Sequence, residues 1–170
     1  VPAFRLPREA IEMDVRLVER LGVTFVFDTT IGVDITFDEL QRDFDSIAIT
    51  AGAMDAVALD IPGADLEGVD YGVDFMKKAN LGQELYVGKD VVVIGGGYTA
   101  MDCSRTSLRH GADNVAIVYR RTRSELVVDE EELGETEREG VRMEFLASPV
   151  EVLGEDGHVW ACHEGQWFDA

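Results

Sequence analysis

A glycine-rich turn between an apolar run and a helical pattern constrains the fold of this chain more than any other feature. Val91–Ile94 is continuously apolar, as in a parallel strand buried on both faces. Gly95, Gly97 and Ala100 follow with the spacing G-x-G-x-x-A, and residues 98–110 have helical periodicity. In a strand–turn–helix unit, such glycines permit a tight turn and the close approach of a pyrophosphate. The sequence therefore predicts a dinucleotide phosphate site at the helix start, and the alternative is a glycine turn without a ligand.

An arginine cluster follows the next predicted strand. That strand is Asn114–Tyr119, and Arg120, Arg121 and Arg123 come directly after it. NAD-specific sites have an acidic residue in this region, which binds the ribose hydroxyls. Guanidinium groups instead bind a 2′-phosphate through charge-assisted, often bidentate hydrogen bonds. The cluster predicts selectivity for NADP, and the alternative is that the arginines pair with an acidic helix predicted at 129–139.

Helical and extended patterns alternate along the chain, which predicts an α/β fold with a parallel sheet. Thr36 and Glu39 have the spacing of a capping box that begins a short helix. On the helix at 98–110, Asp102, Arg105 and Arg109 point away from the small-residue face. The remaining predicted elements are helices at 8–21, 71–79 and 129–139, strands at 23–27, 46–50 and 141–146, and a hairpin that turns at 155–157.

Charge and composition exclude several classes of protein. The chain has 34 acidic and 15 basic residues, a formal charge of −19 that speaks against nucleic acid as a partner. No apolar run approaches the roughly 20 residues of a membrane helix, and no leader segment is evident, so we expect a cytoplasmic protein without a membrane partner. Cys103 and Cys162 are too far apart in sequence for a C-x-x-C pair or a cysteine-ligated cluster, and the three histidines lack metal-ligand spacing.

The segment GGGYTAMDCSRTSLRHGA, followed by IVYRRTR, resembles the NADPH-binding domain of the glutamate synthase small subunit family. Those flavoproteins include the N-terminal part of dihydropyrimidine dehydrogenase and electron-bifurcating ferredoxin–NADP oxidoreductases. Weaker likenesses occur in the family's order at VPAFRLPRE, DTTIGVDIT, AITAGA and IPGADLEGVDYGVDF. The resemblance implies a Rossmann-like NAD(P)-binding domain with a parallel sheet plus a β-hairpin, joined to part of a FAD-binding domain. The implied bounds are 1–60 for the partial FAD-binding domain, 61–87 for a connecting segment and 88–170 for a truncated NADPH-binding domain.

The resemblance also implies roles for the residues that match the family's motifs. Tyr98 departs from the pattern, because relatives usually have Asn or Asp there. Arg123 is a weaker candidate than the two arginines before it, and no catalytic acid or base is implied. The implied cofactor-binding residues are Gly95, Gly96, Gly97, Tyr98, Thr99 and Ala100 at the NADP pyrophosphate, Arg120, Arg121 and Arg123 at its 2′-phosphate, and Ile31, Ala51 and Gly52 at FAD.

The implied function is passage of hydride from NADPH to FAD and then of electrons to iron–sulfur centres outside this chain. The implied partner is the glutamate synthase large subunit or a similar electron acceptor. Three alternatives stay open at this point. They are a non-catalytic NADP-binding module, a flavin-dependent reductase of the ferredoxin–NADP or dihydropyrimidine dehydrogenase type, and a thioredoxin-reductase-like enzyme, against which the missing C-x-x-C counts.

Overall fold

The computed structural model describes residues 1–166, and the side chains of residues 1–159, in two compact units. The first unit comprises Val1–Arg5 together with the chain from Asp55 onward, and the second comprises Leu6–Met54. Within the described part of the chain, no helix combines the length and the apolar character needed to cross a membrane.

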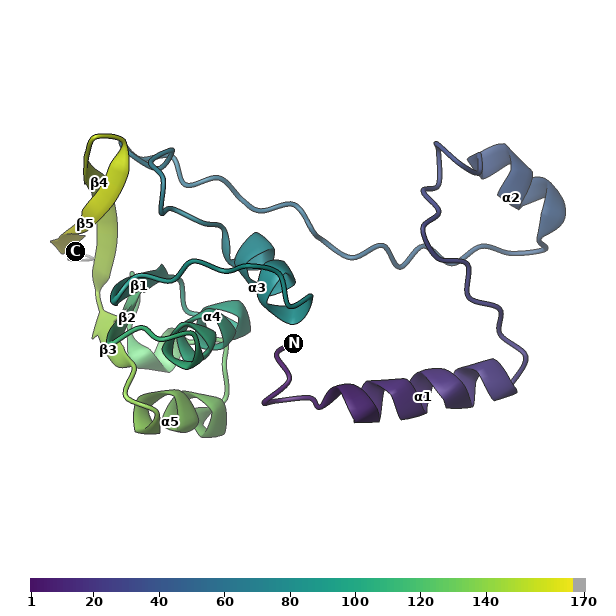
Figure 1. The fold of residues 1–170 in the computed structure, drawn as a ribbon, viewed down its shortest axis with the longest axis horizontal. Helices are drawn as coiled ribbons and strands as arrows, with labels where there is room; N and C mark the ends of the chain where they lie inside the picture. The colour runs from purple at the N-terminus through teal and green to yellow at the C-terminus, as the bar shows by residue number, and fades with distance from the viewer. Residues whose placement is uncertain (167–170) are drawn as a thin grey trace. The chain divides into compact units, whose positions relative to one another are not determined.

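A parallel sheet forms the centre of the first unit (Figure 1). Its strands, in the spatial order β1-β2-β3, are β1 (Asp90–Ile94), β2 (Asn114–Tyr119) and β3 (Arg142–Phe145). The connections between them contain α4 (Tyr98–Arg109), the 3-10 helix η1 (Arg123–Glu125) and α5 (Glu130–Arg138). Because each parallel pair is joined through a helical segment, the predicted α/β class with a parallel sheet is confirmed.

The core lies between this sheet and the two helices α4 and α5. Met101 of α4, Ile117 of β2 and Leu133 of α5 are each 0–1% exposed and belong to one apolar cluster. The prediction that β1 is buried on both faces is wrong, because Val92 and Ile94 are 44% and 42% exposed. β1 is an outer strand of the sheet, whereas the central β2 is the strand whose successive apolar residues are buried.

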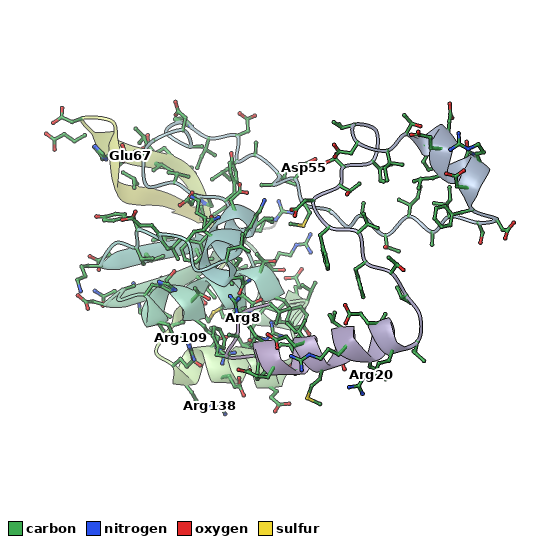
Figure 2. The ribbon with its side chains drawn as sticks, turned by 45° about the vertical axis from the view of Figure 1, so that its right-hand side comes forward. Arg8, Arg20, Asp55, Glu67, Arg109 and Arg138 are labelled. Atoms are coloured by element: carbon green, nitrogen blue, oxygen red, sulfur yellow. The ribbon has the colours of Figure 1, made fainter. Side chains whose placement is uncertain are left out.

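A β-hairpin follows the sheet, as predicted, and consists of β4 (Ala147–Glu155) and β5 (His158–Gln166). The segment before α3 lies along this hairpin through backbone hydrogen bonds. The Glu67 N–H donates to the Gly157 carbonyl at 3.0 Å, and the Val159 N–H donates to the Glu67 carbonyl at 2.9 Å. Figure 2 labels Glu67 beside the hairpin. These bonds attach the segment before α3 to the hairpin within the first unit.

Helix α3 (Gly72–Asn80) packs on α4 through a second, smaller apolar cluster. Phe75, Met76 and Cys103 are the buried members of this cluster. A Cβ on Gly72 would lie 3.1 Å from the Cys103 sulfur, so this glycine allows the close approach of the two helices. The prediction of a helix at 71–79 is confirmed.

The second unit contains two helices, α1 (Arg8–Arg20) and α2 (Phe37–Asp43). The predicted capping box is present: the Glu39 N–H donates to Thr36 Oγ1 at 3.2 Å, and the Thr36 N–H donates to Glu39 Oε2 at 2.9 Å. No residue of 6–54 is buried. The helices of this unit are therefore formed by local signals, without a core.

The predicted strands at 23–27 and 46–50 are not strands in the structure. Residues 23–27 are extended enough for the rings of Phe25 and Phe27 to stack, with their centroids 5.8 Å apart. A strand also needs a hydrogen-bonded neighbour, and the described residues supply none to either segment. The apolar, β-branched composition was therefore insufficient to define a strand.

Candidate functional site

The glycine turn joins the end of β1 to the start of α4, as the sequence predicts. Gly95 has a φ of 138°, which an L side chain rarely adopts. Its N–H donates to the Val118 carbonyl at 3.0 Å, and this bond extends the ladder between β1 and β2 by one residue. The conformation of Gly95 therefore turns the chain sharply while keeping it attached to the sheet.

Gly96 and Gly97 have different steric surroundings. Gly96 is buried, and a Cβ there would overlap the ring of Tyr119 and lie 2.8 Å from Cδ2 of Leu126. At Gly97, the nearest atom to a Cβ would be Cγ2 of Val127 at 3.9 Å, an ordinary van der Waals distance. Gly96 is thus required by packing within the protein. Gly97 is not, and its missing side chain leaves the start of α4 open.

The backbone N–H groups at this turn lack protein acceptors. Among the described residues, none accepts a hydrogen bond from the N–H of Gly96, Gly97, Tyr98 or Thr99. Regular helical bonding begins at Ala100, whose N–H donates to the Gly97 carbonyl at 2.9 Å. Gly97 is the N-cap of α4, and no side chain caps this helix. Free amides and the helix dipole together favour an anion at this position.

The Tyr98 side chain is directed to the start of α5. Its hydroxyl donates to Asp129 Oδ2 at 3.0 Å, and Asp129 Oδ1 accepts the Glu132 N–H at 2.8 Å as the N-cap of α5. These two bonds, the backbone one first, lower the pKa of Asp129. Tyr98 therefore contributes only its unbonded backbone N–H at the glycine turn, while its phenol is bonded to Asp129.

The three arginines of the cluster differ in whether carboxylates bind their side chains. Arg123 donates to Glu137 Oε1 at 2.6 Å and to Glu130 Oε2 at 3.2 Å, and these bonds raise the pKa of Arg123. Within the part of the chain whose side chains are described, neither Arg120 nor Arg121 forms a side-chain hydrogen bond or ion pair, and both are exposed. Pairing with the acidic helix, the alternative stated for the whole cluster, therefore applies to Arg123.

The parallel register brings the glycine turn and the two unpaired arginines to one edge of the sheet. Ile94, the last residue of β1, is paired with Val118 of β2, and β2 ends one residue later, so Gly95 and Arg120 begin the segments beyond the same edge. Parallel α/β sheets bind ligands in the crevice beyond the carboxyl ends of their strands. Free amides and unpaired guanidinium groups thus occur on adjacent strands at the edge where a dinucleotide would bind.

A buried charge network on α4 is a feature that the sequence analysis missed. Arg105, whose side chain is 5% exposed, donates to Glu132 at 2.7 Å, Glu135 at 3.0 Å and Glu139 at 2.8 Å, all on or next to α5. Burial opposes the charge of Arg105, but the bonds to Glu139 and Glu132 outweigh burial and raise its pKa. The charged face of α4 is therefore partly a packing surface, because Asp102 and Arg105 are buried on it whereas Arg109 stays 41% exposed.

The N-terminal segment closes this network. Arg5 donates to Asp102 Oδ1 at 2.8 Å, lies 3.2 Å from Glu132 Oε2, and stacks over the Tyr98 ring with its guanidinium carbon 5.6 Å from the centroid. The ring of Phe4 lies under Arg105, at 4.8 Å. In the sequence, the buried network was indicated only by the spacing of charged residues on α4 and by the acid-rich helix that follows. That spacing does not reveal which residues of the chain cover the face.

The residues implied for FAD all lie in the second unit. Ile31 is 51% exposed and forms an isolated bridge with Ile35, and Ala51 and Gly52 are exposed in an irregular segment. A pocket of about 350 Å³ in this unit contains none of the three, because it is lined by Phe37, Gln41, Phe44, Asp45, Ser46 and Ile47. The structure therefore does not bring the predicted flavin-contacting residues together in this pocket.

Cys103 is buried against α3, and burial raises the pKa of its thiol to about 12. A thiol with this pKa remains protonated near neutral pH and is a weak nucleophile. The side chain of Cys162 lies outside the described residues.

Curated relatives match most of the chain. The NADPH-Fe(3+) oxidoreductase subunit beta of Geobacter sulfurreducens is 38% identical over 159 residues, which are 90% of this chain and 23% of that protein. The NADP(+)-dependent formate dehydrogenase subunit beta of Moorella thermoacetica is also 38% identical, over 94% of this chain and 23% of its own length. The glutamate synthase [NADPH] small chain of Halomonas elongata is 35% identical over 92% of this chain and 35% of its own length. The chain thus spans between about a quarter and a third of these relatives.

Solved structures share the fold at lower identity. A ferredoxin reductase for the CYP199A2 system from Rhodopseudomonas palustris is similar over 64% of this chain and 28% of its own, with a TM-score of 0.50 and 23% identity. The thioredoxin reductase of Lactococcus lactis is similar over 66% of this chain and 39% of its own, with a TM-score of 0.50 and 19% identity. The sequence model of the pyridine nucleotide-disulphide oxidoreductases matches residues 8–170. The chain therefore belongs to the pyridine nucleotide-disulphide oxidoreductase family.

Proposed function

We propose that this chain is the NADPH-binding part of a flavoprotein oxidoreductase. The observation that carries the proposal is the combination of free amides at the start of α4 with the unpaired guanidinium groups of Arg120 and Arg121 at the same sheet edge. Amides suit the pyrophosphate of a dinucleotide, and guanidinium groups suit the 2′-phosphate that distinguishes NADP from NAD. The names of the relatives from Geobacter, Moorella and Halomonas, which all contain NADP or NADPH, support the same cofactor.

Two groups of residues would hold the nucleotide. The open Cβ side of Gly97 and the orphaned N–H groups of residues 96–99 fit a phosphate anion. The proposed pyrophosphate-binding residues are Gly95, Gly96, Gly97, Tyr98 through its backbone, Thr99 and Ala100, of which Gly95 and Ala100 would act through the tight turn and the close helix packing, since their own N–H groups are already bonded. Arg120 and Arg121 would bind the 2′-phosphate. Arg123 would act indirectly, since its guanidinium group is already bonded to two carboxylates of α5.

When bound, NADPH would supply hydride for the reduction of a flavin, and the onward passage of electrons to iron–sulfur centres outside this chain is the finer part of the same proposal. The protein's own part is binding, orientation and electrostatics, and we assign no catalytic acid or base. By likeness to the glutamate synthase small chain, the electron acceptor is the large subunit of that enzyme or a similar protein. Location in the cytoplasm is part of the same proposal.

The flavin side of the proposal depends on the family alone. We assign residues 1–60 to part of a FAD-binding domain, 61–87 to the connection and 88–170 to the NADPH-binding domain. Ile31, Ala51 and Gly52 remain the proposed FAD contacts. Since these three residues are exposed and do not line the pocket of their unit, they do not by themselves fit a flavin, and we derive no step through it.

Titration of the full-length protein with NADPH and NADH tests the nucleotide assignment. The double variant Arg120→Ala/Arg121→Ala should lose about 10- to 100-fold in NADPH affinity and little in NADH affinity, because it removes charged hydrogen bonds to the 2′-phosphate only. Arg123→Ala is the matched control, and its NADPH affinity should remain within about threefold of the wild type. Equal affinity of the wild type for both nucleotides, or no loss in the double variant, would overturn the proposal.

A further inference from the structure

Tyr119, the last residue of β2, contacts both halves of the proposed nucleotide site. Its ring occupies the space beside Gly96 in which a Cβ would otherwise lie. Its hydroxyl donates to the carbonyl oxygen of Glu125 at 3.0 Å. One half-buried side chain thus contacts the glycine turn with its ring and the end of the arginine-bearing loop with its hydroxyl.

The loop that Tyr119 closes is fixed at several further points. Glu125 accepts the Thr122 N–H at 3.0 Å and the Thr122 hydroxyl at 2.8 Å. On the other side, the Arg121 carbonyl accepts the Leu146 N–H at 3.2 Å. Arg120 and Arg121 therefore project from a backbone whose two ends are held, although their own side chains have no ion-pair partner within the described residues.

We propose that Tyr119 is a positioning residue for NADP selectivity, which sets the spacing between the glycine turn and the loop that carries Arg120 and Arg121. This inference rests on the proposed function. The pyrophosphate and the 2′-phosphate are joined covalently within one nucleotide, so their binding groups must be held at a matching separation. A side chain that packs on one group and bonds to the other supplies that separation before the ligand binds, which lowers the ordering cost of binding. Tyr119 itself touches neither phosphate in this account.

The test compares Tyr119→Phe with Tyr86→Phe in the full-length protein. Tyr119→Phe keeps the ring against Gly96 and removes only the bond to Glu125. Tyr86 is 87% exposed, so its variant controls for loss of a phenol hydroxyl elsewhere in the same unit. Calorimetric titrations with NADPH and NADH give the dissociation constants, and hydrogen exchange without nucleotide reports on the loop directly.

We expect Tyr119→Phe to weaken NADPH binding about 3- to 10-fold, as befits the loss of one hydrogen bond, and to leave NADH binding within twofold. Amides of residues 120–125 should exchange faster, and those of α4 should not change. Tyr86→Phe should match the wild type in each measurement.

A Tyr119→Phe variant that retains the wild-type ratio of NADPH to NADH affinity would overturn this inference. Equal weakening of both nucleotides would do the same, because it would show a merely structural role. Unchanged exchange in residues 120–125 would likewise contradict it. A wild-type protein that does not distinguish the two nucleotides would instead remove the proposed function, and the inference with it.

Discussion

The two units of the chain contain similar amphipathic patterns with different outcomes. In the first unit, the patterns of α4, α5 and β2 place Met101, Leu133 and Ile117 in a core where they are almost fully enclosed. In the second, α1 has apolar residues at helical spacing, yet Ile11 and Leu17 are 43% and 57% exposed. A local pattern is therefore enough to define a helix, whereas burial needs a second element with a complementary face.

The residues proposed to bind cofactors differ between the two units in the same way. The glycine turn and the arginine loop adjoin paired strands, and both are held by hydrogen bonds that the parallel register makes possible. Ile31, Ala51 and Gly52 have no such sheet support, because Ile31 forms only an isolated bridge and the other two lie in irregular chain. Matched substitutions in the two units should therefore differ in their effect on stability.

The largest expected effect comes from removing an arginine of the buried charge network. Arg105→Ala should cost about 3–4 kcal/mol of unfolding free energy, because it leaves the buried Glu132 with one ion partner fewer. Arg16→Ala is the matched change in α1, where the pair with Glu12 is two-thirds exposed, and it should cost at most about 0.5 kcal/mol. Chemical denaturation of both variants measures the difference. Similar losses of unfolding free energy in the two variants would show that burial of the ion pair does not determine its contribution to stability.

A smaller effect is expected from one core leucine. Leu133→Ala in α5 should cost about 2–3 kcal/mol, because Leu133 is 1% exposed and its removal leaves a cavity. Leu17→Ala in α1 makes the same change in helix propensity at a site that is 57% exposed, and should stay within about 0.5 kcal/mol of the wild type. Denaturation midpoints report both values, and a Leu17→Ala loss as large as that of Leu133→Ala would contradict the account.

The smallest effect is a dependence of stability on pH. Hydrogen bonds from Arg109 and Arg105 lower the pKa of Glu139 from 4.5 to about 2. Because the folded-state pKa is the lower one, this carboxylate contributes stability above pH 4.5 and loses the contribution as the pH falls toward 2. The difference in Tm between wild type and Glu139→Gln should therefore be constant above about pH 5 and shrink below it.

Glu39→Gln is the control for that measurement. Glu39 belongs to the capping box of the exposed helix α2, where hydrogen bonds from the backbone and the side chain of Thr36 lower its pKa. Since no residue of its unit is buried, the variant should leave the acid dependence of the global Tm unchanged. A Tm difference for Glu139→Gln that grows below pH 4.5 would reverse the sign that the ion pair requires.

Sequence patterns predicted the elements around the site well, because the residues that begin and end these elements act locally. Asn114–Tyr119 has the same bounds in the structure, and α4 begins directly after Gly97, where the glycine spacing places it. The acidic helix begins after its N-cap Asp129, whose carboxylate accepts the Glu132 N–H. Glycine conformation and capping side chains act within a few residues, so one short stretch of sequence contains the information.

Features that depend on distant partners were not predictable in this way. Exposure of Val92 and Ile94 follows from the position of β1 at the sheet edge, which the apolar run itself does not reveal. The arginines could not be separated by sequence, because their pairing depends on which residues of α5 face the loop. Arg105 was expected to point away from the small-residue face of its helix, and only the packing of α5 and the N-terminal segment shows that it is buried.

Phosphorus NMR of NADP+ bound to the full-length protein tests whether Arg120 and Arg121 bind the 2′-phosphate. A phosphate monoester has a second pKa of about 6, and adjacent guanidinium groups favour its dianion. We expect the 2′-phosphate signal to titrate at a lower pH in the wild-type and Arg123→Ala complexes than in free NADP+. In the saturated Arg120→Ala/Arg121→Ala complex, the titration should return to that of free NADP+. A 2′-phosphate that titrates as in free NADP+ while bound to the wild type would contradict the account.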